Sequence, residues 1–190
     1  MKRNAIALSI AFGILLLGGQ GFARAADACA PLIPGALRMA IAHSYPDYRL
    51  PRQSDYDAYN IKYNVEHGGN GCLGIATGSY YRRSSTDYAI NITSTTKLHT
   101  LLIVAEQVAA KWRLELVWDW GDEPGGRVYV DTEVPGSYER TEALDGPISE
   151  PGERESYTSK RQGLVAGAIE STGAAFFLDG KHWVHVWISD

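Results

Sequence analysis

Hydrophobic and polar residues alternate along much of the chain, which is the pattern of half-buried β-strands. The clearest example runs from Trp112 to Trp120, where tryptophan or leucine occupies every second position. We expect these apolar side chains to line one face of a strand. Arg113, Glu115 and Asp119 then line the opposite face.

Further strands are expected where short apolar or alternating runs lie between turn-forming residues. The run Leu101 to Ala105 is apolar on both faces, which is typical of a central strand. The pair Asp179-Gly180 predicts a tight hairpin. The remaining expected strands cover residues 61–66, 72–77, 87–93, 127–133, 164–170, 174–179 and 181–188.

One helix is expected near the beginning of this pattern. Pro34 suits a first helical position, Leu37 and Ile41 share a face at helical spacing, and Pro46 cannot continue the helix. Residues 46–60, rich in Pro, Asp and Tyr, are expected to form a loop. The pattern therefore predicts a mainly β fold (α+β at its margin). A single antiparallel sheet, sandwich or barrel of about eight or nine strands would carry one N-terminal helix.

The first 25 residues have the layout of a secretory signal peptide. Lys2 and Arg3 precede an apolar run, and Ala23-Arg24-Ala25 matches a cleavage site. We therefore expect a periplasmic or secreted protein with a single β-rich domain at residues 26–190. A lipid anchor on Cys29 is the less favoured alternative, because Ala26 stands where such a signal needs a leucine-like residue. No second apolar stretch approaches the roughly 20 residues of a membrane span.

Two cysteines follow the expected cleavage site, and an exported chain with two cysteines favours a disulfide. Cys29 and Cys72 would close a loop of about 44 residues, worth about 4 kcal/mol in the chain-entropy model. No C-x-x-C motif suggests a redox role instead.

The charge balance argues against one class of partner. Removal of residues 1–25 would leave 15 basic and 22 acidic residues, a net charge of −7 with neutral histidines. Nucleic-acid binding needs clustered Lys and Arg, so no nucleic-acid partner is expected. An acidic surface suits solubility or a basic protein partner.

One stretch resembles a known calcium loop. Residues 78–89 place Gly78, Asp87 and Tyr88 on positions of the loop of FG-GAP/VCBS-type repeats, which lies between two strands. Calcium needs several charged oxygens, whereas the other acidic positions of that loop carry Ser79, Tyr81 and Arg83 here. The resemblance thus implies a strand-loop-strand unit without a metal.

The long polar connection at about 134–163 is expected to be mobile or functional. Its charged residues suggest a recognition loop that presents acids to a basic partner, held by a rigid sheet. The residues proposed to bind there are Tyr138, Glu139, Arg140, Glu142 and Asp145.

The last expected strand offers a second binding surface. Trp183, His185 and Trp187 fall on one of its faces, and Val184, Val186 and Ile188 fall on the other. If the valine face packs inward, the aromatic strip faces outward and can hold a sugar ring or a protein loop. The alternative is a strand buried on both faces, in which tryptophan fills volume.

No catalytic or cofactor motif is present. Asp119, Asp122 and Glu123 cluster at a turn, where acids are usually solvated. His182 and His185 point to opposite faces of a strand and cannot chelate one ion. Neither a metal nor a cofactor is therefore expected, and Asp55, Asp57 and Asn60 are too common a loop composition to indicate one.

These observations favour an exported, non-enzymatic binding domain. The first hypothesis is an inhibitor or immunity protein directed against a basic periplasmic toxin or cell-wall hydrolase. The alternatives are a glycan-binding module using exposed tryptophan, and a hydrolase using the carboxylates near Asp119.

Overall fold

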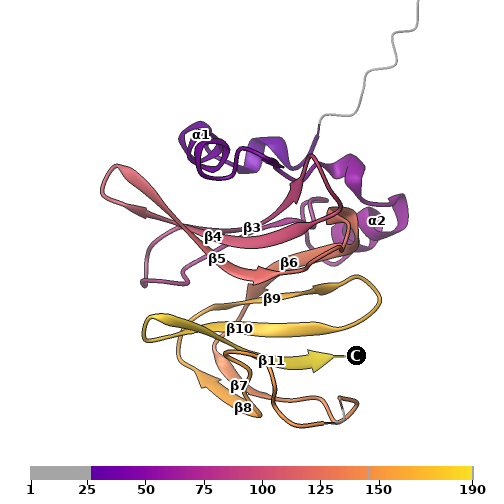
Figure 1. The fold of residues 1–190 in the computed structure, drawn as a ribbon, viewed down its shortest axis with the longest axis vertical. Coiled ribbons are helices and arrows are strands. Elements are labelled where there is room, and N and C mark those ends of the chain that lie inside the picture. Colours follow the sequence, from indigo (N-terminus) through magenta and orange to yellow (C-terminus); the bar gives the residue numbers. More distant parts are fainter. Residues whose placement is uncertain (1–26, 145, 190) are drawn as a thin grey trace, which may run out of the picture.

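The computed structural model describes residues 27–144 and 146–189 (Figure 1). It confirms the mainly β fold, as a sandwich-like stack of antiparallel sheets. The expected signal peptide and Asp145 lie outside the described residues. No helix among those described is long and apolar enough to be a membrane span.

Two sheets and a hairpin make up the β structure. The first sheet has the order β1-β3-β4-β5, with β2 also paired to β3, and the second has the order β11-β10-β9-β6. All of these pairs are antiparallel, and β7 pairs with β8 alone. The strands are β1 Tyr48–Arg49, β2 Ile75–Gly78, β3 Asp87–Ser94, β4 Thr100–Val108, β5 Lys111–Asp119, β6 Val128–Glu133, β7 Gly136–Glu139, β8 Ser156–Ser159, β9 Gly163–Ala168, β10 Gly173–Asp179 and β11 His182–Ser189.

The layers are stacked, with helix α1 (Gly35–Ser44) on the outer side of the first sheet and the β7–β8 hairpin on the outer side of the second (Figure 1). Three apolar clusters fill the spaces between these layers. The cluster between the sheets includes Leu102 and Val104 from β4 and Leu164 and Phe176 from the second sheet. Both β3 and β4 are buried on both faces, as expected for the central run 101–105.

A β-bulge overturns the expectation that β5 has one continuous apolar face. Leu102 pairs with Trp118, but its neighbour Ile103 pairs with Leu116, so β5 contains one extra residue at this point. The extra residue exchanges the two faces. Trp112 consequently packs with the cluster beneath α1, whereas Trp118 packs between the sheets.

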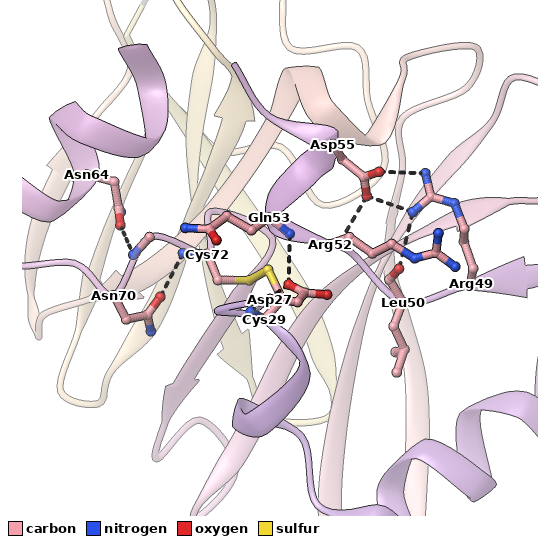
Figure 2. Close-up of a disulfide and its surroundings, with 11 residues drawn as sticks. Asp27, Cys29, Arg49, Leu50, Arg52, Gln53, Asp55, Asn64, Asn70 and Cys72 are labelled. Atoms are coloured by element: carbon pink, nitrogen blue, oxygen red, sulfur yellow. Dashed lines mark hydrogen bonds and ion pairs between the residues drawn. A yellow bond between two sulfur atoms is a disulfide. The ribbon is translucent and has the colours of Figure 1, made fainter. Parts of the chain in front are cut away.

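The Cys29–Cys72 disulfide predicted from the sequence is present in the structure (Figure 2). Both cysteines are buried in the cluster beneath α1. Asp27 strengthens the junction, because its Oδ1 accepts hydrogen bonds from the backbone N–H groups of Cys29 and Gln53, each at 3.0 Å. The disulfide therefore joins the start of the described chain to the segment that leads into β2.

A second helix, α2 (Ala58–Glu66), replaces the strand expected at 61–66 and part of the loop expected at 46–60. Asp57 caps its N-terminus, since its carboxylate accepts the Asn60 N–H at 2.8 Å. Gly68, with φ of 88°, follows its end in a conformation that glycine adopts readily. The rest of the expected loop holds β1 and a short 3-10 turn, η2 (Gln53–Asp55).

Candidate functional site

The polar connection predicted between 134 and 163 contains the β7–β8 hairpin and a long loop, whose described residues 140–144 and 146–155 we call the strap. The strap lies along the edge of β11. The Arg154 N–H donates to the His185 carbonyl at 2.8 Å, and the His185 N–H donates to the Gly152 carbonyl at 2.9 Å. The Thr141 N–H donates to the Trp187 carbonyl at 2.9 Å. These bonds cover a sheet edge that would otherwise expose unpaired backbone groups.

A buried ion pair holds the strap together. Glu153, 3% exposed, accepts the Arg140 Nε–H at 3.1 Å and also the N–H groups of Ser149 and Glu150. Burial alone would raise the pKa of Glu153, but these hydrogen bonds and the Arg140 charge outweigh it and lower the pKa. Arg140 and Glu153 thus stabilise the loop and are not free to bind a partner.

The His185 ring lies beneath the strap and is 2% exposed. Its Nε2 is 3.2 Å from Glu150 Oε2, and its ring packs edge-on against Trp118 at a centroid separation of 4.9 Å. Burial lowers the pKa of His185, although the hydrogen bond and charge of Glu150 oppose this effect. The aromatic surroundings therefore favour the neutral ring.

The outward-facing aromatic strip expected on β11 is not found, and the alternative of a strand covered on both faces holds. Trp183 and Trp187 are half-buried against the core between the sheets. Val184 packs on the other face with Phe177, which in turn contacts the Tyr138 ring at a centroid separation of 4.8 Å. The β7–β8 hairpin is the cover that the sequence pattern did not reveal.

Glu139 and Glu142 of the polar connection are exposed, and so are the carboxylates proposed at the turn after β5, Asp119, Asp122 and Glu123. Asp119 pairs with His99 at 3.1 Å. In the stretch 78–89, Asp87 is fully buried and its Oδ2 accepts the N–H groups of Tyr80 and Tyr81. Asp87 thus organises the loop backbone. Across the described residues no cluster of three His, Cys, Asp or Glu is arranged to hold a metal.

A pocket of about 380 Å³ lies between α2, β6 and the turn from β9 to β10. Figure 1 shows α2 beside β6 at one side of the stack. The residues that line it include Tyr59, Tyr63, His67, Tyr129, Asp131 and Glu170. We identify this pocket as the candidate functional site.

Helix α2 supplies a row of aromatic rings, because residues four apart lie on the same helical face. Tyr59 and Tyr63 stack at a centroid separation of 6.4 Å, and Tyr63 and His67 stack at 4.0 Å. The Tyr59 and Tyr63 side chains are 66% and 54% exposed, respectively. Large aromatic side chains left exposed at the mouth of a pocket are suited to contact a ligand.

Sheet residues make the opposite wall acidic. Tyr129 and Asp131 come from β6, and Glu170 comes from the turn after β9. Burial raises the pKa of Tyr129, and the carboxylates of Asp131 and Glu133 raise it further, so its hydroxyl stays protonated. Among the described lining residues there is no lysine or arginine. The pocket therefore combines aromatic surface with negative charge.

This site was not anticipated from the sequence, although a signal for it existed. Tyr59, Tyr63 and His67 have helical i, i+4 spacing, but the strand assigned to 61–66 concealed that relation. Comparison with protein-family models, with curated proteins and with solved structures yields no match for this chain.

Proposed function

We propose that this protein is a binding domain whose pocket between α2 and β6 receives a cationic side chain of a basic protein partner. The observation that carries the proposal is the convergence of exposed tyrosine rings with two carboxylates. A lysine ammonium or arginine guanidinium is attracted both to the face of a tyrosine ring and to a carboxylate.

The charge of the rest of the chain supports the same class of partner. The full sequence has a net charge of −4 at pH 7, and Glu139 and Glu142 expose further carboxylates on the hairpin and the strap. Such charges accelerate the encounter with a basic protein, whereas the buried contacts determine how long the complex lasts. The net negative charge of the whole protein then attracts the partner, no single exposed acid being decisive, and the pocket anchors it.

An inhibitor or immunity protein against a basic toxin or cell-wall hydrolase fits this mode of binding. An anchoring arginine or lysine in an aromatic pocket is a typical hot spot of a protein interface. The disulfide is consistent with a compartment outside the reducing cytosol.

The test is calorimetric titration of residues 26–190 with Nα-acetyl-lysine amide and Nα-acetyl-arginine amide, whose side chains keep their positive charge, and with a basic lysozyme. We expect Tyr63→Ala to weaken binding about tenfold and Asp131→Asn about fivefold, since both remove direct contacts. The matched control is Glu142→Gln, an exposed acid on the strap, which should change affinity less than twofold. If Glu142→Gln weakens binding as much as Asp131→Asn, or if no cationic probe binds, the pocket is not the anchor.

A saccharide ligand is the second candidate, because stacked tyrosine rings beside the amide groups of Asn60 and Asn64 also suit a sugar ring. Titration with peptidoglycan fragments and neutral oligosaccharides separates the two. A neutral sugar should bind with little dependence on salt, whereas a cationic probe should bind more weakly as NaCl rises.

A further inference from the structure

Beyond residue 25, the chain contains two pairs of adjacent basic residues, Arg82-Arg83 and Lys160-Arg161. The fold brings these distant pairs to one place. Arg83, Lys160 and Arg161 line a cleft of about 330 Å³ between the β2–β3 loop and the segment that joins β8 to β9. None of the described residues that line this cleft is acidic.

The three cations of the cleft have no carboxylate partners among the residues that the structure describes. Arg82, by contrast, lies 2.7 Å from the buried carboxylate of Glu106. Arg82 of the first pair therefore forms an ion pair within the fold, whereas its neighbour Arg83 lines the cleft without a carboxylate partner among the described residues. This concentration of positive charge lies on an otherwise acidic protein.

Neighbouring groups position two of the donors of the cleft, Arg161 and Gln162. Arg161 Nη1 donates to the Tyr81 carbonyl at 3.1 Å, which fixes the guanidinium and leaves its other nitrogens available. The Ser79 N–H donates to the side-chain oxygen Oε1 of Gln162 at 2.9 Å, which leaves the side-chain nitrogen Nε2 of Gln162 as a donor for a ligand. Guanidinium, ammonium and amide N–H groups together match the oxygen atoms of a phosphate group.

We propose that this cleft is a binding site for a phosphate group, separate from the tyrosine pocket. Arg83 and Arg161 donate hydrogen bonds to two phosphate oxygens, and Lys160 contributes a point charge. The net negative charge of the protein repels anions in general. An anion should therefore bind only where it can contact all three cations of the cleft at once.

The experiment is an NMR titration of ¹⁵N-labelled residues 26–190 at constant ionic strength. Separate arms use inorganic phosphate, glucose 6-phosphate and vesicles of phosphatidylglycerol in phosphatidylcholine. We expect saturable amide shifts in residues 79–85 and 160–162, with none in α2. Tightest binding in the first arm identifies free phosphate, in the second a phosphorylated sugar and in the third a lipid headgroup.

Charge variants provide the decisive comparison. Arg83→Gln and Lys160→Gln should each weaken phosphate binding about fivefold, whereas the adjacent control Arg82→Gln should change it less than twofold. Both test residues are exposed, so folding is expected to be unaffected, and thermal melting checks this. Absence of saturable shifts in all three arms, or equal losses for Arg82→Gln and Arg83→Gln, would overturn the proposal.

Discussion

Replacement of Glu153 by glutamine should release the strap from β11 without unfolding the sandwich. The substitution keeps the size of the side chain but removes the charge that faces Arg140. Glu153 is 3% exposed, so solvent cannot replace the lost partner. The strap then contains a buried cation without a counter-charge, which is the costly state of a broken ion pair.

The magnitude follows from the contacts that remain. Removing one member of a buried pair destabilises a protein by about 3–5 kcal/mol. Arg140 retains the carbonyls of Leu144 at 2.7 Å and Gly146 at 3.2 Å, and a glutamine oxygen can still accept one backbone N–H. We therefore expect a loss at the lower end of this range, about 3 kcal/mol. Most of it should appear as a lower free energy of local opening of the strap.

Amide hydrogen exchange measures this opening directly. The N–H groups of Thr141, Arg154 and His185 join the strap to β11, and their protection should fall about 100-fold, since 1.4 kcal/mol corresponds to a factor of ten. Protection in β3 and β4 should be unchanged. The control Glu142→Gln alters an exposed acid of the same loop and should have no effect. Equal protection in the two variants would refute the assignment of Glu153 as the anchor.

Three further predictions concern the whole fold. The double variant Cys29→Ala/Cys72→Ala should lose about 4 kcal/mol of unfolding free energy in urea titration, because the described disulfide spans 43 residues. Folding lowers the pKa of His185, so as the pH falls the unfolded chain takes up this proton before the folded chain does. The free energy of unfolding should therefore be greatest above about pH 6.5 and decrease below it. Urea titrations across this pH range should show a smaller decrease in His185→Gln. Gly126→Ala should destabilise by about 1–3 kcal/mol in thermal melting, because the added Cβ would overlap a backbone carbonyl of η2, whereas Gly35→Ala, which has open space, should not.

The fold class could be predicted because most strands follow local rules. Runs such as 87–93 and 101–105 carry enough apolar residues to be recognised without knowledge of their partners. The β5 bulge could not be predicted in this way. The exchange of the two faces of β5 depends on one residue that has no partner in β4. The alternation from Trp112 to Trp120 is the same for a regular strand and for a strand with this bulge.

The candidate site was missed for a related reason. The segment 61–66 has no strong apolar periodicity, and α2 buries none of its residues. Its clearest local signal is the Asp57 cap, which precedes the segment that was assigned to a strand. The sequence could show that Trp183 and Trp187 share one face of β11. It could not show that the β7–β8 hairpin covers the opposite, valine face, which allows the tryptophan face to point into the core between the sheets.

The two proposed sites lie towards opposite ends of β6, which makes their functions separable. Tyr129 and Asp131 belong to the acidic pocket, whereas Pro135, just beyond the strand, lines the basic cleft. The pocket carboxylate of Asp131 and Pro135 are four residues apart, and four residues of extended chain span about 13 Å, more than the screening length of about 8 Å at physiological ionic strength. A cation in the pocket should therefore not compete with a phosphate in the cleft. If saturating phosphate weakens binding of acetyl-arginine amide at constant ionic strength, the sites are coupled through the protein, and their independence would have to be abandoned.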